Sequence, residues 1–258
     1  MEEGFIKVEL GFGKQSKLLL VPAKNIGKIM HGEKIDVQLS EAEVVEQALK
    51  DPIKALPIDG TFKKGDKVVV ITSDLTRPMP SYKVLPQLIM ELNRAGIEDN
   101  DITIVFGLGI HRKQTVEEKR KLVGDDVFIR ITCIDSDPDD VVSLGVTSSG
   151  TPVDIFRQVV EADKRICLGN IEYHYFAGYS GGYKAIMPGV STFPAIQKNH
   201  SHMVEEGARA SNLVNNPVRD DIEEVAGFIK IDFLFNVVLN EHKKIIGAFA
   251  GDPVAAHR

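Results

Sequence analysis

Unbroken apolar runs alternate with segments of helical periodicity along most of this chain. The run Lys67–Thr72 is β-branched and continuous, which is typical of a strand covered on both faces, and apolar residues recur at helical spacing from Ser81 to Arg94. The alternation continues with strands predicted at Asp101–Phe106, Val127–Ile134 and Arg165–Leu168, and helices predicted at Thr115–Val123 and Ile155–Ala162. This order predicts an α/β fold with a mostly parallel, doubly wound (Rossmann-like) sheet.

Both ends of the chain depart from that alternation. Residues 5–11 and 17–21 alternate as in a short hairpin, and Ser40 with Glu43 predicts a capped helix start. A Pro- and Gly-containing stretch then leads us to predict an accessory hairpin and helix over residues 1–56 and an α/β core over residues 57–258. A helix over 218–226, strands over 233–239 and 244–249, and the opening of a further helix at 251–258 complete the predicted order.

Charge and composition exclude several classes of protein. The 31 basic and 37 acidic residues give a formal charge of -6, which argues against a nucleic-acid binder. No apolar run has the length of a membrane span and no charged-then-apolar leader is present, so we expect a cytoplasmic protein without a membrane partner. Cys133 and Cys167 lie in apolar runs and are interpreted as reduced core thiols.

Ligands of open α/β sheets bind beyond the carboxyl ends of the strands, and the first such segment is Ser73–Pro78. Arg77 offers a planar fork for a carboxylate or phosphate, and Thr76 offers a hydroxyl. Asp74 can accept from a ribose hydroxyl. The alternative is that Asp74 and Arg77 only pair with each other to tighten the turn.

The second segment is Gly107–Arg112. Its first two glycines invite comparison with the dinucleotide fingerprint, but Arg112 stands where the third glycine belongs, so that motif is absent. His111 remains as a candidate acid or base on a strand-end turn, with a surface histidine of no role as the alternative.

The third segment, Tyr173–Lys184, combines His174 with several glycines and a lysine. It is not a P-loop, because Tyr183 precedes the lysine and Ala185 follows it. Glycines permit close backbone approach to a ligand, and an amine beside that ligand can form a covalent link to a carbonyl or carboxyl-derived group. The alternative is a tight turn with a solvated lysine.

The remaining histidines differ in whether their sequence neighbours suggest a functional role. His200 and His202 stand two positions apart on a predicted helix over 192–203 and therefore point in different directions, so only one of them is expected in a site. The histidines with no supporting neighbours are interpreted as surface residues; these are His31, His242 and His257.

Common hydrolase motifs are missing, since the chain has no HExxH, no GxSxG and no cysteine pairs at zinc spacing. The remaining groups describe an α/β enzyme that acts on a small anionic substrate. Two alternatives stay open. One is a non-catalytic small-anion binding domain, and the other is a metal-dependent hydrolase with zinc on His111, His174 and His200.

Taken together, the motifs resemble the nickel-dependent lactate racemase family. The matching positions run in order and are Asp74-x-Thr76-Arg77-Pro78, Gly109-x-His111-Arg112, His174-x-x-x-Gly178-x-Ser180-Gly181-Gly182-x-Lys184, Pro188-Gly189 and Asn199-His200. The resemblance implies racemisation or epimerisation of lactate-type 2-hydroxyacids by an isomerase that carries a nickel pincer nucleotide. In the family, hydride passes from the substrate to this cofactor and returns to either face of a transient ketoacid.

The resemblance also implies a role for each matching residue. Lys184 would tether the cofactor, His200 would ligate nickel, and Arg77 would hold the substrate carboxylate. The paired acid/base residues would be His111 and His174. The wall around the cofactor would comprise Asp74, Thr76, Gly178, Ser180, Gly181 and Gly182.

Family members continue beyond this length into a second domain that closes over the cleft. The chain is therefore interpreted as the N-terminal, cofactor-bearing domain of a two-domain racemase. Its expected partners are the 2-hydroxyacid substrate, its own C-terminal domain and the enzymes that build the cofactor. Because half of the water-excluding pocket would be missing, we expect the chain alone to racemise poorly.

Overall fold

The computed structural model describes residues 4–30, 35 and 37–258, which form two compact units divided between residues 36 and 37. The first unit is the predicted hairpin. Its strands β1 (Phe5–Phe12) and β2 (Gln15–Pro22) pair antiparallel, and the 3₁₀ helix η1 (Ala23–Asn25) follows. The second unit contains all the other helices and strands described below.

A six-stranded sheet in the order β12-β11-β8-β3-β4-β5 forms the centre of the second unit. Its strands are β3 (Val68–Ser73), β4 (Ile102–Gly107), β5 (Thr132–Asp135), β8 (Lys164–Ile171), β11 (Phe233–Leu239) and β12 (Ile245–Gly251). Neighbouring strands are parallel except β11 and β12, which are antiparallel. The predicted α/β fold with a mostly parallel sheet is confirmed.

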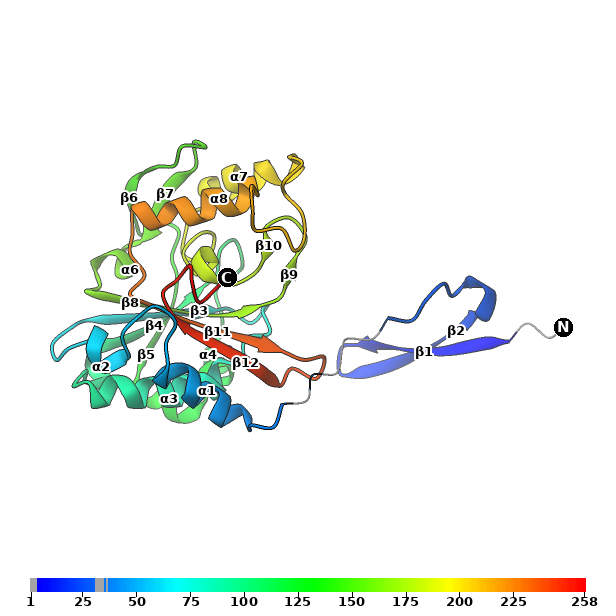
Figure 1. Ribbon diagram of the computed structural model, residues 1–258, viewed down its shortest axis with the longest axis horizontal. Coiled ribbons are helices and arrows are strands. Elements are labelled where there is room, and N and C mark those ends of the chain that lie inside the picture. The colour runs from blue at the N-terminus through cyan, green and yellow to red at the C-terminus, as the bar shows by residue number, and fades with distance from the viewer. Residues whose placement is uncertain (1–3, 31–34, 36) are drawn as a thin grey trace. The chain divides into compact units, whose positions relative to one another are not determined.

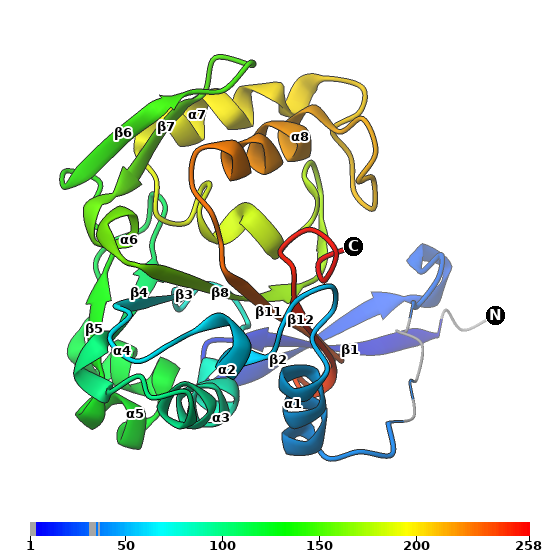
Figure 2. The same ribbon diagram turned by 60° about the vertical axis from the view of Figure 1, so that its left-hand side comes forward.

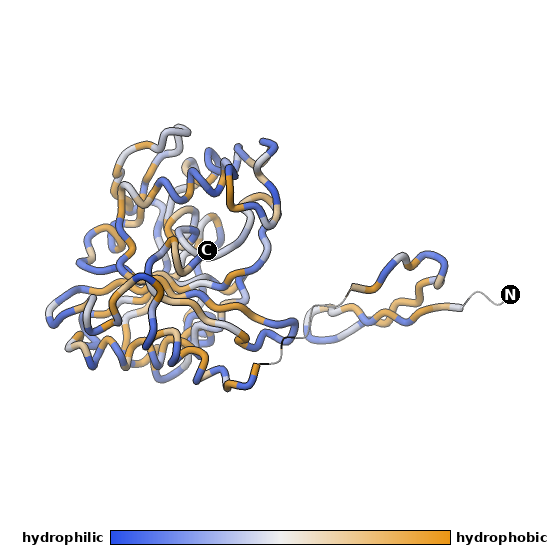
Figure 3. Tube along the Cα trace, viewed as in Figure 1, coloured by the Kyte–Doolittle hydropathy of each residue, from blue (hydrophilic) through white to orange (hydrophobic). Residues whose placement is uncertain are grey.

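Both faces of this sheet are covered, so alternate residues of its strands enter two separate cores (Figures 1 and 2). Val68 and Val70 face the first layer, which comprises α1 (Glu41–Lys50), α2 (Ile58–Thr61), α3 (Ser81–Arg94), α4 (Val116–Val123) and α5 (Asp125–Arg130). Val69 and Ile71 face the second layer, which comprises β6 (Val141–Val146), β7 (Pro152–Phe156), α6 (Arg157–Glu161), α7 (Phe193–Ser201) and α8 (Pro217–Glu224). Figure 3 shows the hydrophobic residues along the central strands.

Several short elements complete the second unit. They are η2 (Asp99–Asp101), β9 (Tyr173–His174), β10 (Gly178–Tyr179), η3 (Gly182–Ala185), η4 (His202–Val204) and η5 (Val225–Gly227). Within the described residues, no helix combines the length and the apolar character needed to cross a membrane. Both cysteines are free, and burial raises the pKa of each thiol, as expected for core residues.

Helix α1 belongs to the α/β unit, whereas the sequence grouped it with the hairpin. The predicted capping box is present, since Ser40 and Glu43 each accept a hydrogen bond from the other's backbone N–H. Glu41 then accepts from Lys83 Nζ on α3 at 2.7 Å and from the N–H of Ile245 on β12 at 2.7 Å. These bonds and the buried face of α1 place the helix against the sheet layer.

Two predicted elements were wrong over part of their length. The apolar run Val127–Ile134 forms helix α5 and then the short strand β5, because Gly124 ends α4 with a positive φ of 86° and the chain starts a new helix at Asp125. The predicted helix Ile155–Ala162 begins as strand β7, because its first residues pair with β6. In the second case tertiary pairing overrides the local pattern.

The strand order creates a topological switch point between β3 and β8. From β3 the chain adds β4 and β5 on one side, and later β8 and β11 on the other side. Connections leave in opposite directions at such a point, which opens a crevice beyond the carboxyl ends of the two strands. The segments that follow β3 and β8 are those in which the sequence placed Arg77 and Lys184.

Candidate active site

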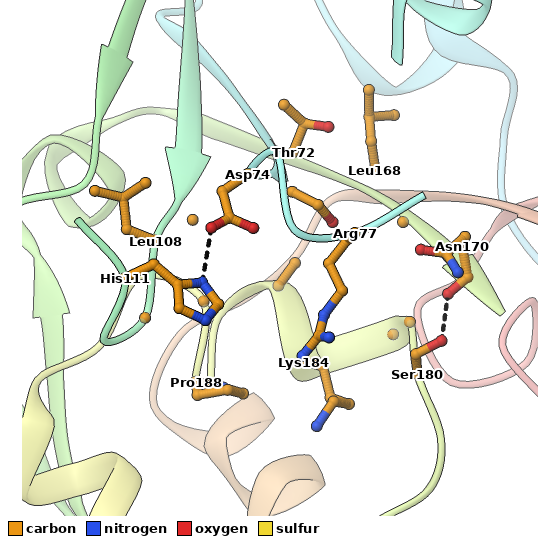
Figure 4. A pocket seen from close by; sticks show the side chains of 18 of the residues that line it. Thr72, Asp74, Arg77, Leu108, His111, Leu168, Asn170, Ser180, Lys184 and Pro188 are labelled. Atoms are coloured by element: carbon orange, nitrogen blue, oxygen red, sulfur yellow. Dashed lines mark hydrogen bonds and ion pairs between the residues drawn. The ribbon is translucent and has the colours of Figure 1, made fainter. Parts of the chain in front are cut away.

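A pocket occupies this crevice, and Figure 4 shows its labelled side chains. Its walls come from the ends of β3, β4 and β8, from the glycine-rich segment after β8 and from α7. Eight of the predicted site residues line it: Asp74, Arg77, His111, Ser180, Gly181, Gly182, Lys184 and His200. The other three are not part of the lining and are Thr76, His174 and Gly178.

The buried carboxylate of Asp74 pairs with the exposed imidazole of His111 at one side of the pocket. The distance from Asp74 Oδ2 to His111 Nδ1 is 2.7 Å, and Thr76 Oγ1 donates to the other carboxylate oxygen at 2.7 Å. A carboxylate only accepts, so Nδ1 of His111 carries the proton and Nε2 is left as the basic nitrogen. Thr76 therefore acts on the site through Asp74.

Arg77 is exposed, and its backbone N–H closes a turn on the Asp74 carbonyl at 3.3 Å. The alternative in which the two side chains pair with each other does not hold, because the Asp74 carboxylate is engaged by His111 and Thr76. Within the described part of the chain, no ion pair engages the Arg77 guanidinium. This planar fork is therefore available to an anion in the pocket.

The wall that carries His111 packs directly on the turn Pro188–Gly189. The Gly109 N–H donates to the Gly189 carbonyl at 2.9 Å, and a Cβ on Gly107 would lie 3.1 Å from the Gly189 backbone. The GxG of this segment thus serves close packing of two walls, in agreement with the absence of a dinucleotide fingerprint.

Lys184 lies on η3 and is partly buried in the pocket. Desolvation, reinforced by the positive charges of Arg219 and Arg77, lowers the pKa of its amine to about 7. An amine with this pKa is neutral in a large fraction of molecules at neutral pH, and the neutral form is the nucleophile. The side chain is therefore suited to covalent attachment of a ligand.

The glycine-rich segment is held in one shape by packing on both sides. Ser180 Oγ donates to the Asn170 carbonyl at 2.6 Å and accepts from the Glu172 N–H at 2.9 Å. Gly178 has a φ of 75°, and a Cβ there would stand 2.2 Å from the Asn212 carbonyl oxygen. Gly178 thus contributes close packing beneath the segment, and the pocket wall itself is formed by Ser180 and the two glycines that follow.

His200 projects from α7 into the pocket, and its Nε2 is buried without a hydrogen-bond partner. Burial and the charge of Lys184 lower its pKa to about 4, so the ring is neutral at pH 7. The neighbouring Asn199 points the other way and donates to Asp221 on α8 at 2.7 Å. His202 begins η4, pairs with Glu205 at 2.5 Å and lies outside the pocket lining, so only one of these two histidines reaches the site.

His174 is not in the pocket lining and packs beside Phe176 at a ring-centroid distance of 4.5 Å, and His200 contacts the same phenyl ring at 5.0 Å. Its Nδ1 accepts from the Ala177 N–H at 3.2 Å. Burial and the charges of Lys184 and Arg77 lower its pKa to about 3. The ring is therefore neutral at pH 7, and because Nδ1 accepts a hydrogen bond, its one proton is on Nε2, which is a donor.

The prediction that His257 is a surface residue was wrong. The ring is 6% exposed, and its Nε2 lies 2.8 Å from the Ser180 carbonyl oxygen. Asp252 accepts from the N–H groups of Val254 and Ala255 and turns the chain back beneath the glycine-rich segment. His242 is exposed as predicted, and His31 lies outside the described residues.

Acid is expected to destabilise the apoprotein through its buried histidines. Burial lowers the pKa of His257 to about 4, so the folded chain binds fewer protons there than the unfolded chain does. This stabilisation is complete above about pH 6.5 and is lost as the pH falls towards the folded pKa. For His257 the loss between pH 7 and pH 5 is about 2 kcal/mol in the free energy of unfolding. Urea titrations at both pH values should show this loss shrinking in His257→Gln and unchanged in His242→Gln; equal losses in both variants would contradict the assignment.

The described residues do not form a metal centre by themselves. Across residues 4–30, 35 and 37–258, no three His, Cys, Asp or Glu side chains are placed to hold a metal ion together. The alternative of zinc on His111, His174 and His200 therefore has no geometric support. A metal at His200 needs further ligands from a bound group.

The fold and the pocket define a doubly wound α/β protein with its ligand site at the topological switch point. Residues 12–211 match the sequence pattern of the lactate racemase N-terminal domain. The chain belongs to the lactate racemase family.

Two curated relatives and one solved structure give the extent of this similarity. The lactate racemase of Lactiplantibacillus plantarum is 38% identical over 86% of this chain and 53% of its own length. That of Thermoanaerobacterium thermosaccharolyticum is 33% identical over 97% of this chain and 60% of its own length. The structure of the latter apoprotein superposes with a TM-score of 0.83 over 98% of this chain and 60% of that chain. The chain thus spans little more than half the length of these relatives.

Proposed function

We propose that this chain is the cofactor-bearing part of a racemase or epimerase for lactate-type 2-hydroxyacids. The observation that carries the proposal is the meeting of Lys184, Arg77, His111 and His200 in one pocket at the switch point. The named activity of the family's relatives supports it. A carboxylate anchor, a base and a nucleophilic amine are the parts that such a reaction needs from the protein.

The pocket fits a nickel pincer nucleotide attached through Lys184. The buried Nε2 of His200 lacks a partner, as a metal ligand awaiting its ion would, and imidazole suits nickel. The depressed pKa of Lys184 favours covalent attachment, and its positive neighbours favour an anionic nucleotide. Asp74 and Ser180–Gly182 would form the wall around the group, with Thr76 and Gly178 supporting that wall from behind. When bound, the group supplies a hydride acceptor.

The side chains of this chain would bind the substrate and move its proton. Arg77 would hold the carboxylate through its free guanidinium fork. His111, oriented by Asp74, would take the hydroxyl proton at Nε2 from one enantiomer. His174, kept neutral by burial, would serve the other enantiomer, and to act as a base it would exchange the Ala177 N–H at Nδ1 for the substrate hydroxyl. A separate base for each enantiomer of the substrate would allow either enantiomer to be formed.

The proposed racemase function also implies partners for this chain. A second domain like that of the longer relatives would cover the exposed pocket and exclude water. Enzymes that build the cofactor would act before or at attachment to Lys184. The cytoplasm is the proposed compartment, which agrees with two free cysteines in the core.

Coexpression with cofactor-building enzymes tests the proposal. Intact mass spectrometry should show a covalent increment on Lys184, and the purified protein should hold about one nickel ion per chain. Nickel should disappear from His200→Ala and remain in His202→Ala, the matched control from the adjoining helix η4. An unmodified Lys184 under these conditions would contradict the proposal.

The alternative of a non-catalytic anion-binding domain draws on the free guanidinium of Arg77 beside Lys184. Such a domain would keep its affinity for inorganic phosphate when His111 and His174 are replaced by glutamine, and it would carry neither nickel nor a covalent increment. Calorimetry on the same proteins separates the two functions.

A further inference from the structure

Arg219 of α8 is buried completely and lies behind the glycine-rich segment. Its guanidinium donates to the carbonyl of Ala177 at 3.2 Å, to that of Gly181 at 3.5 Å, and to that of Tyr179. Asn216, which caps the same helix, donates from Nδ2 to the Phe176 carbonyl at 2.9 Å. The first turn of α8 thus binds four carbonyls of the segment that leads to Lys184.

Stability alone does not explain an arginine at this place. Each oxygen that accepts from the guanidinium is a neutral backbone carbonyl, and burial of a cation without a carboxylate partner is costly. The surrounding core is apolar, since Val218 and Ile222 of the same helix pack in it. An apolar side chain of similar length would avoid the cost of burying a cation, but it would leave these three carbonyls without a donor.

The orientation of the carbonyls that Arg219 binds connects this arginine to the pocket. In a trans peptide, the N–H of the next residue points opposite to the carbonyl. The Gly181 carbonyl faces Arg219, so the Gly182 N–H faces away from α8. Gly181, Gly182 and Lys184 line the pocket, and Arg219 does not.

We propose that Arg219 is a positioning residue that holds the carbonyls of Ala177, Tyr179 and Gly181, and thereby fixes the glycine-rich segment in the shape that presents Lys184 to a ligand. The role of Lys184 as an attachment point rests on the proposed function. The shape of the segment does not, and it can be tested with a simple anion.

Arg165 provides a matched control within the chain. Its guanidinium is partly buried and also donates to three backbone carbonyls, those of Val159, Val160 and Ala162. It lies near the start of β8, whereas the pocket lies beyond the end of that strand. Loss of this arginine removes a comparable set of hydrogen bonds without touching the pocket.

The experiment compares Arg219→Met, Arg219→Lys and Arg165→Met with the wild-type chain. Thermal unfolding measures stability, and calorimetry at fixed ionic strength measures the affinity for inorganic phosphate. Both methionine variants should unfold at lower temperature. Arg219→Met should bind phosphate at least about tenfold more weakly than the wild type. Arg219→Lys should bind it about threefold more weakly, because lysine keeps the positive charge but lacks the planar guanidinium that reaches several carbonyls. Arg165→Met should stay within about twofold of the wild type.

Equal phosphate affinity in Arg219→Met and Arg165→Met would overturn the proposal, and so would an absence of phosphate binding by the wild type. If Arg219→Met does not fold, Arg219→Lys decides, because unchanged affinity in that variant contradicts a positioning role. Intact mass after coexpression adds a second readout, in which Arg219→Met should carry at least tenfold less modified Lys184. A wild type that stays unmodified speaks against the proposed function, while the phosphate measurements still decide the role of Arg219.

Discussion

Replacing Lys184 with arginine is expected to abolish covalent attachment of the cofactor. Arginine keeps a positive charge in the pocket but stays protonated at any physiological pH, so it offers no free amine. If the proposed function is right, racemisation by the cofactor-loaded protein should fall by at least about a thousandfold, because a cofactor held only by reversible contacts loses the fixed geometry that the tether provides. Intact mass spectrometry and a chiral assay of enantiopure lactate measure the two effects.

Lys198→Arg is the control for this substitution. Lys198 lies on α7, outside the pocket lining, so its variant should keep both the mass increment and the activity. A full increment on Lys184→Arg would show that the attachment point is elsewhere, and activity without any increment would show that attachment is not needed.

Removal of either proposed base is expected to give the second large effect. His111→Gln and His174→Gln should each lower kcat for racemisation by about 10²–10⁴, the usual contribution of a general acid or base. Both directions of the reaction should slow together, because each enantiomer is the product of one direction and the substrate of the other. The measurement compares initial rates of racemisation from each enantiomer by the cofactor-loaded protein.

His202→Gln is the matched control, since His202 pairs with Glu205 outside the pocket lining and should leave kcat within about twofold. Because His174 packs beside Phe176 and is not in the pocket lining, its variant is the more informative of the two. A His174→Gln protein with unchanged kcat and a full mass increment would assign the second base to another residue.

Much of the fold follows from local sequence signals. The β-branched run of β3 and the capped helices α1 and α4 lie where the pattern predicts, because burial on both faces and capping are each encoded within a few residues. Helix α5 was assigned to a strand because Val127 and its apolar neighbours have no clear period over so short a run. The strand β7 depends on its pairing with β6, which no local pattern displays.

The pocket could be located from sequence because strand ends in a parallel sheet meet at one edge. The residues behind it could not. Arg219 reads as an ordinary charge on an amphipathic helix, and His257 as a polar residue near a turn. Their roles arise from contacts with carbonyls about forty and eighty positions away, which only the folded chain brings together.

The two side chains that brace the glycine-rich segment lie later in the chain than Lys184 itself, on α8 and after β12. During synthesis the lysine therefore leaves the ribosome well before its supports do. The pocket can take shape only once the last strand has joined the sheet and the chain has turned back beneath it. Any modification that requires the finished pocket would accordingly act only after synthesis has passed His257, and would pass over shorter nascent chains.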